Sequence, residues 1–295
     1  MGIPGSEDWR LVEPVEGGWS GDRKYRVLTG DGDRLLLRVS PGDRRDRKAR
    51  EFQALCEMDV LTLWMSRPVD FGDCADGRVY TLLTYLTGDM AEEALPALPP
   101  ALQYRLGIAA GEALRAIHTL PAPPDAEDWA ARYHRKIDRK IEMLAACPLS
   151  VPGADDMLRF VADHRHLAAG RPQTFQHGDF HVGNLIISGD RVGVIDFDRL
   201  DWGDPWEEFN RVVWCAMVSP AFASGRVVGY FGGDPPREFF ALMALYVAVN
   251  QLSSAPWAMQ FGDADVQKML TQAALVTGWY DRFRTVVPSW YRREG

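Results

Sequence analysis

Two short acidic motifs that flank a predicted β-hairpin constrain this chain more than any other feature. Residues 177–184 read H-G-D-F-H-V-G-N, and residues 195–198 read I-D-F-D. The apolar runs between them, residues 184–188 and 191–195, are predicted strands, and Gly189-Asp190 suits a two-residue hairpin turn. Such a hairpin can bring Asp179, Asn184 and Asp196 together at its open end.

These residue types suit one kind of chemistry. Asp179 supplies a carboxylate that can accept a proton from a hydroxyl group. Asn184 and Asp196 supply an amide oxygen and a second carboxylate. Mg²⁺ prefers oxygen ligands of this kind and leaves its other positions for water and substrate phosphates. The pattern therefore predicts Asp179 as a catalytic residue, with Asn184 and Asp196 as metal ligands.

The motifs resemble those of the aminoglycoside phosphotransferase family, which are antibiotic kinases with a protein-kinase-like fold. The family signature continues from H-G-D, Asn and I-D to G-D-P-x-x-D, and residues 203–208 read G-D-P-W-E-E, with Glu208 where the family usually has Asp. The resemblance is strong over residues 174–208. It implies an α+β fold with a small, β-rich N-lobe at residues 1–86 and a larger, mostly helical C-lobe at residues 87–295.

The resemblance also implies how the N-lobe binds the nucleotide phosphates. The glycine-rich run at residues 17–21 would cover them through Ser20, although it fits a plain surface turn equally well. Arg38 stands where kinases have Lys, and a guanidinium can hold phosphate oxygens through two parallel bonds. Glu51, on the next predicted helix, is expected to pair with Arg38, the alternative being a solvated helix charge.

The adenine is expected to bind where the predicted strand at residues 78–86 reaches a hinge at residues 84–89. The backbone carbonyl of Thr84 and the backbone amide of Leu86 would meet its edge. An ordinary core strand is the alternative, because only the fold analogy separates the two. ATP is the expected nucleotide, with GTP as the alternative.

Apolar periodicity predicts the remaining elements. Residues 24–28 and 34–39 are expected to form a hairpin, followed by a helix at residues 46–58 with Phe52, Leu55 and Cys56 on its apolar side. Further helices are expected at residues 102–117, at 129–144 and through most of the chain from 206. Among these, residues 239–251 have the composition of a buried core helix.

The charge of the chain bears on its partners. The sequence has 33 Lys and Arg against 41 Asp and Glu, which gives a formal net charge of −8. This acidity argues against generic nucleic-acid binding. Next to a kinase-type motif, it favours a cationic acceptor, which Asp198, Asp201 and Glu207 are candidates to face. Asp204 and Glu208 are instead expected to cap a helix beginning near Pro205.

The sequence therefore predicts a phosphotransferase that uses ATP and Mg²⁺ to phosphorylate a hydroxyl of a small cationic molecule, such as an aminoglycoside. A metabolic kinase acting on choline, homoserine or an amino sugar carries the same motif. A nucleotide-binding module without catalysis is a third interpretation, which the presence of all three motif residues opposes. A zinc site formed by His177, Asp179 and His181 is a weaker alternative.

The remaining features concern location. The four cysteines are widely spaced and form no paired motif, and the first residues lack the pattern of a secretory signal. The longest strongly apolar stretch, residues 239–249, is too short to cross a bilayer. We therefore expect a cytoplasmic protein that is not bound to membranes. The sequence does not reveal the oligomeric state, and a monomer is favoured.

Overall fold

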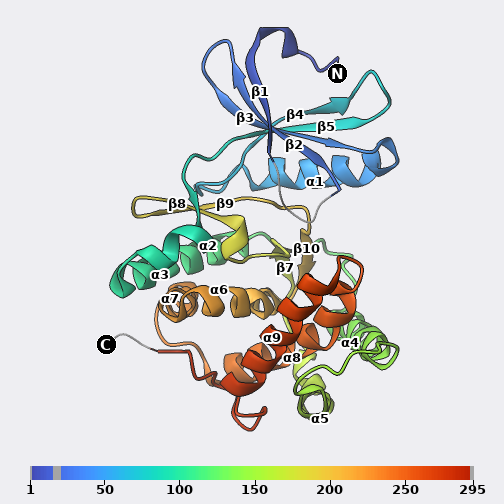
Figure 1. Ribbon diagram of the computed structural model, residues 1–295, viewed down its shortest axis with the longest axis vertical. Helices are drawn as coiled ribbons and strands as arrows, with labels where there is room; N and C mark the ends of the chain where they lie inside the picture. The colour runs from blue at the N-terminus through green and yellow to red at the C-terminus, as the bar shows by residue number, and fades with distance from the viewer. Residues whose placement is uncertain (1, 16–20, 293–295) are drawn as a thin grey trace.

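The computed structural model describes residues 2–15 and 21–292. In these residues the N-terminal part is a five-stranded antiparallel sheet with the order β1-β2-β3-β5-β4 and one long helix, α1, against it (Figure 1). Its elements are β1 (Trp9–Val15), β2 (Arg23–Thr29), β3 (Arg34–Ser40), α1 (Arg45–Met58), β4 (Pro68–Asp73) and β5 (Val79–Thr84).

Strand β3 shows how the sequence positions the sheet. Leu35, Leu37 and Val39 alternate into a small apolar cluster on one face. Residues between them face the other way, so Leu36 and Arg38 line the cleft below the sheet. The β2–β3 hairpin and α1 form where the sequence predicts them. The predicted apolar side of α1 is partly wrong: Leu55 is buried as expected, but Cys56 is exposed, and Ala54 and Met58 are buried with Leu55.

The C-terminal part consists of helices and two small sheets. The sheets are β6 (Asp89–Met90) with β8 (Leu185–Ser188) and β9 (Arg191–Val194), and β7 (Thr174–Gln176) with β10 (Asp201–Gly203). The helices are α2 (Ala91–Ala94), α3 (Pro100–Ile117), α4 (Trp129–Ala145), α5 (Ala154–His164), α6 (Val212–Val218), α7 (Pro220–Phe231), α8 (Arg237–Ala258) and α9 (Asp263–Trp279). Figure 1 shows the β8–β9 hairpin between the upper sheet and the lower helices. This arrangement is the α+β, kinase-like fold that the sequence predicts, whereas the division after residue 86 stays a proposal.

Helix α8 is the centre of the helical part. It is long and apolar enough to span a membrane by length and composition, but 72% of its most apolar window is buried inside the molecule. Tyr246 of α8 packs edge-on against Tyr133 of α4, with ring centroids 4.9 Å apart. The prediction of a buried core helix over residues 239–251 is confirmed.

Helices α3 and α7 approach each other more closely than side chains would allow. A Cβ atom at Gly111 of α3 would lie 2.2 Å from the carbonyl oxygen of Arg226, and one at Gly229 of α7 would lie 2.2 Å from that of Ile108. The same is true of Gly107 and Gly225. Glycine is therefore required at these four crossing points, because any side chain would push the two backbones apart.

Substitution of one of these glycines should loosen the pair. We expect Gly111→Ala to lower the free energy of unfolding by about 1–3 kcal/mol, because the added methyl group overlaps the α7 backbone. Urea unfolding measures this change. The control is Gly278→Ala on α9, where a Cβ atom has no neighbour within 4 Å. Equal effects of the two substitutions would contradict the packing explanation.

Candidate active site

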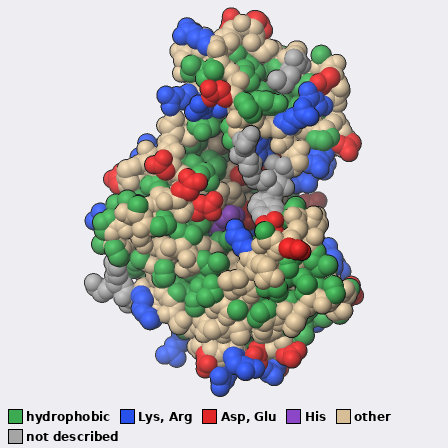
Figure 2. All heavy atoms as spheres, viewed as in Figure 1, with side chains coloured by type: hydrophobic (Ala, Val, Ile, Leu, Met, Phe, Trp, Pro, Cys, Tyr) green, Lys and Arg blue, Asp and Glu red, His purple; other side chains and the backbone are tan. Residues whose placement is uncertain are grey.

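A cleft of about 1030 Å³ separates the sheet from the helices. Figure 2 shows the hollow between the two parts, with histidine and basic side chains visible inside it. Its lining includes six of the predicted site residues outside the acceptor set, namely Arg38, Thr84, Leu86, Asp179, Asn184 and Asp196, and one residue of the acceptor set, Asp198. Residues from opposite ends of the sequence thus meet at one surface.

Glu208 holds the loop that carries Asp179. Its carboxylate accepts hydrogen bonds from the backbone amides of His177 at 2.6 Å and Gly178 at 2.8 Å. Gly178 has a φ of +80°, and a Cβ atom there would lie 1.8 Å from the carbonyl oxygen of Arg199. This loop conformation therefore requires glycine. Glu208 is not the helix cap that the sequence predicts, but Asp204 is, accepting from the amide of Trp206 at 3.0 Å.

Buried His177 joins this loop to the second motif. The amide of Asp179 donates to Nδ1 of His177 at 3.2 Å, so Nε2 carries the proton and donates to the carbonyl of Ile195 at 2.9 Å. Both ring nitrogens are therefore occupied. Among the residues that the structure describes, no group of three or more His, Cys, Asp and Glu side chains could hold a metal ion. The zinc alternative is thereby opposed.

The carboxylate of Asp179 is surrounded by cationic and polar side chains. Arg211 Nε lies 3.0 Å from Oδ1, Arg199 Nε lies 3.6 Å from Oδ2, and His181 Nε2 lies 3.7 Å from Oδ1. Burial acts to raise the pKa of Asp179, but the charge of Arg211 and the contacts with His181 and Arg199 hold that pKa well below its usual range. Asp179 is therefore ionised. The sequence analysis missed Arg211, which no motif marks.

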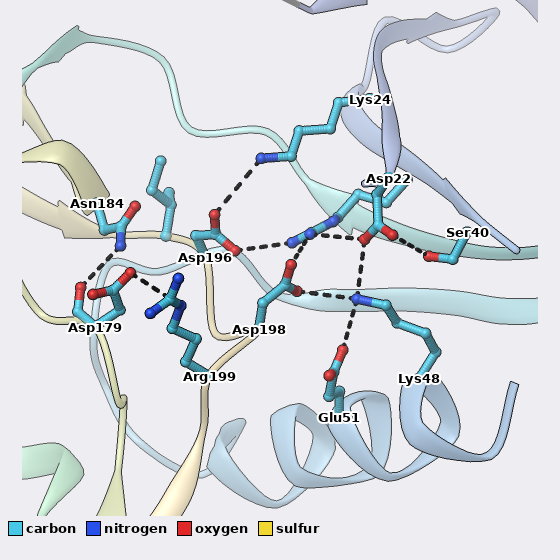
Figure 3. A network of polar contacts seen from close by, with 12 residues as sticks. Asp22, Lys24, Ser40, Lys48, Glu51, Asp179, Asn184, Asp196, Asp198 and Arg199 are labelled. Carbon is cyan, nitrogen blue, oxygen red and sulfur yellow. Dashed lines mark hydrogen bonds and ion pairs between the residues drawn. The ribbon is translucent and has the colours of Figure 1, made fainter. Parts of the chain in front are cut away.

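Asn184 and Asp196 lie at the two ends of the β8–β9 hairpin, as predicted (Figure 3). The side-chain amide of Asn184 donates to the carbonyl of Asp179 at 2.8 Å, which leaves its amide oxygen as the atom that can bind a cation. Asp196 has a left-handed backbone with a φ of 65°. Burial raises its pKa, but Arg38 at 3.0 Å and Lys24 at 3.6 Å outweigh this and keep the carboxyl ionised.

Arg38 is buried at the meeting point of the two parts, but it does not pair with Glu51. It binds Asp22 at 2.9 Å, Asp196 at 3.0 Å and also Asp198. Lys48 of α1 stands between Arg38 and Glu51, because its ammonium group lies 2.8 Å from Glu51, 3.0 Å from Asp22 and 3.3 Å from Asp198 (Figure 3). The predicted Arg38–Glu51 pair is therefore replaced by a chain of ion pairs through Lys48 and Asp22, neither of which the sequence analysis identified.

The three carboxylates expected to face a cationic acceptor do not do so. Asp198 lines the cleft but is neutralised by Arg38 and Lys48. Asp201 pairs with Arg132 at 3.0 Å, and Glu207 pairs with Lys136 at 2.7 Å; neither lines the cleft. The reason is that β10, which begins at Asp201, pairs with β7 away from the cleft. Ser20 lies outside the described residues.

The carboxylate of Glu208 should be needed for stability. Glu208→Gln keeps only one strong acceptor for the two loop amides, so we expect the free energy of unfolding to fall by about 1–3 kcal/mol. Burial raises the pKa of Glu208, but the hydrogen bond and charge of His118 lower it more, so folding favours the ionised form. The wild type should therefore lose this contribution as the pH falls below 4.5, the ordinary pKa of this group.

Unfolding measured from pH 7 down to about pH 3, which enters the range below 4.5, tests both effects. The difference between wild type and Glu208→Gln should shrink as the pH falls. Glu57→Gln, at an exposed position of α1, is the control and should leave stability unchanged. A Glu208→Gln variant as stable as the wild type at pH 7 would show that the loop does not depend on this carboxylate.

Comparison with known proteins agrees with this geometry. A model of the phosphotransferase enzyme family matches residues 11–240. The fold is similar to that of the GDP complex of wild-type aminoglycoside 2'-phosphotransferase-IIIa, with a TM-score of 0.71 and 16% identity, over 92% of this chain and 94% of that one. It is also similar to a choline/ethanolamine kinase family protein from Mesorhizobium loti, with a TM-score of 0.67 and 20% identity, over 96% and 94% of the two chains.

A curated mouse (Mus musculus) protein, acyl-CoA dehydrogenase family member 10, is 22% identical over 223 residues, or 71% of this chain. The chain spans about a fifth of that relative's length. The family match, in contrast, includes all the motif residues and the sheet from Leu11 onward. The chain therefore belongs to the phosphotransferase enzyme family.

Proposed function

We propose that this protein transfers the γ-phosphoryl group of a nucleoside triphosphate, ATP in the first instance, to a hydroxyl group of a small molecule. The observation that carries the proposal is the convergence of Asp179, Asn184 and Asp196 with buried Arg38 in one cleft. Structures of similar fold also support it, since they contain GDP or ADP. An enzyme of this kind needs a positioned base, cation-binding oxygens and a phosphate-binding cation, and the cleft offers all three.

Asp179 is the proposed catalytic residue. Its ionised carboxylate orients the acceptor hydroxyl and receives the proton as the new P–O bond forms and the bond to the leaving nucleotide diphosphate breaks. Arg211 and Arg199 hold the carboxylate in place. Because they also lower the pKa of Asp179, it remains ionised across the physiological pH range.

Asn184 and Asp196 are the proposed ligands of Mg²⁺, for which one amide oxygen and one ionised carboxylate are a suitable donor set. Held by these two residues, Mg²⁺ would supply positive charge that stabilises the charge developing on the phosphates. Arg38 is the proposed phosphate-binding cation, and Ser20 the proposed contact from the glycine-rich run. Thr84 and Leu86, which line the cleft at the end of β5, are the proposed adenine contacts. Glu51 acts on Arg38 only indirectly, through Lys48.

The acceptor expected from the sequence, a cationic molecule such as an aminoglycoside, stays a prediction. A kanamycin complex is known for a protein of similar fold, but that protein is only 17% identical to this chain. The carboxylates that motivated the prediction are paired with cations of the protein itself. A non-catalytic module is disfavoured, since it would not need an ionised Asp179 inside the cleft.

Removal of the proposed base should abolish turnover without abolishing nucleotide binding. We expect Asp179→Asn to lower kcat at least a hundredfold, because the hydroxyl loses its proton acceptor. ADP release and calorimetric ATP binding are the two measurements. Asp201→Asn, which alters an exposed carboxylate outside the cleft, is the control. If Asp179→Asn retained the wild-type kcat, the proposed mechanism would be wrong.

The ion-pair chain predicts an order of effects on nucleotide affinity. Arg38→Gln should weaken binding of Mg²⁺–ATP about tenfold or more, because it removes a cation from the phosphate side of the cleft. Glu51→Gln should have a smaller effect, since Asp22 and Asp198 still hold Lys48. Calorimetry with both variants tests this order. A larger loss of affinity for Glu51→Gln than for Arg38→Gln would contradict the indirect role of Glu51.

A further inference from the structure

The helical wall of the cleft, beyond Asp179, is basic. Among the residues that the structure describes, the cations that line it are Arg139, Lys140, Arg199, Arg211 and Lys268. The carboxylates of the helical part that line the cleft are Glu92, Glu93, Asp179, Asp196 and Asp198, and none of them comes from α4, α6, α8 or α9. The face formed by α4, Arg211 and α9 therefore presents positive charge alone, in a chain whose formal net charge is −8. Charge in a cleft acts on a bound ligand more strongly than the net charge of the molecule does.

The carboxylate of Asp179 does not balance the charge of this wall. Both Arg211 and Arg199 contact its carboxylate oxygens, so one carboxylate serves two guanidinium groups. Arg139, Lys140 and Lys268 form no ion pair with a carboxylate in the described part of the chain. Lys268 instead lies over the ring of Trp214, at 4.9 Å from the centroid. These cations are therefore available to a ligand.

Lys140 of α4 is the most informative of them. Its ammonium group has Asn250 Oδ1 as a neutral acceptor at 3.4 Å. Burial lowers the pKa of Lys140 well below its ordinary value, and the charges of Lys136 and Arg211 lower it further. The charge of Glu207, which is bound to Lys136 at 2.7 Å, acts in the opposite direction but does not outweigh these effects. A bound anion would act in the same direction as Glu207 and favour the protonated, cationic form of Lys140.

We propose that the acceptor carries an oxyanion, which Lys140 and Arg211 bind while its hydroxyl group faces Asp179. The inference rests on the proposed phosphotransferase function and names its substrate class, a hydroxylated carboxylate, phosphate ester or sulfate. Lys140 comes from α4 and Arg211 from the residue preceding α6, so two elements hold the anion beside the base. A polycationic acceptor would meet like charges along this wall, and its positive groups would displace the arginines from Asp179.

Calorimetric titration with sulfate tests the proposal. The protein is first saturated with Mg²⁺ and a non-hydrolysable ATP analogue, so that sulfate cannot occupy the phosphate side of the cleft. Sodium sulfate is then titrated at constant ionic strength, and kanamycin in a parallel experiment. We expect sulfate to bind in the millimolar range, Lys140→Gln to weaken that binding at least tenfold, and kanamycin not to bind.

The matched control is Arg135→Gln. Arg135 is on the same helix but pairs with Glu127 outside the cleft, so its loss should leave the sulfate affinity unchanged. If Lys140→Gln does not fold, Lys268→Gln, at an exposed position of α9, takes its place with an expected loss of at least threefold. Circular dichroism distinguishes folded from unfolded variants.

The possible results separate the two proposals. Sulfate that does not bind, that binds equally well to the wild type and the lysine variants, or that is outcompeted by kanamycin would overturn the oxyanion acceptor. A wild-type protein that does not bind the ATP analogue would instead contradict the proposed function. The sulfate titration still reports on the helical wall in that case, because its dependence on Lys140 or Lys268 locates the site.

Discussion

The site depends on one buried carboxylate. Glu208 lies within the helical core and accepts hydrogen bonds from two consecutive backbone amides of the loop that presents Asp179. Its own carbonyl accepts from Arg226 at 3.2 Å, and the same guanidinium donates to the carbonyl of Phe180 at 2.9 Å. Arg226 can reach this position because α7 packs on α3 through glycines. The close helix crossing thereby helps to fix the position of the Asp179 carboxylate.

A second set of contacts joins the sheet to this rigid base. Arg38 from β3 binds Asp196 and Asp198, which follow the β8–β9 hairpin, and Lys48 from α1 binds Asp198 as well. The cations of the sheet and α1 thus meet the carboxylates of the helical part across the cleft. Burial strengthens these interactions, because the surroundings screen charge less than water does. We propose that Arg38 and Lys48 also bind the nucleotide phosphates. Phosphate oxygens would then replace some of the carboxylate oxygens that these cations contact here.

The parts of the site that the sequence predicted are those encoded by short motifs. Asp179, Asn184 and Asp196 lie within 18 positions of one another, and a hairpin is enough to bring them together. The pairing of Glu51 was mispredicted because the helix offers closer partners. Arg47 and Lys48 precede Glu51 by four and three residues, which is the spacing of neighbours on a helix surface. The contacts of Asp22, Arg211 and Arg226 at the site depend on long-range packing. No local sequence pattern indicates them.

The helical wall of the cleft shows a further limit of sequence reasoning. Net charge and a run of acidic residues favoured a cationic acceptor, yet Asp201 and Glu207 do not line the cleft and pair with Arg132 and Lys136, and the cleft face formed by α4, Arg211 and α9 is basic. Which face of an element a charge occupies is decided by strand pairing and helix packing, and composition does not record it. The sequence was therefore sufficient for the fold class and for bringing Asp179, Asn184 and Asp196 into one cleft, but not for the charge that a ligand would meet there.

The central claim is the transfer of a phosphoryl group to a carbon-bound hydroxyl. The most direct measurement is ³¹P NMR of the protein with ATP, Mg²⁺ and a mixture of small hydroxylated acids, amines and neutral sugars. The account predicts a new phosphomonoester resonance that grows in step with ADP and requires Mg²⁺. Release of the γ-phosphate only as inorganic phosphate, with no phosphomonoester at any time, would contradict it.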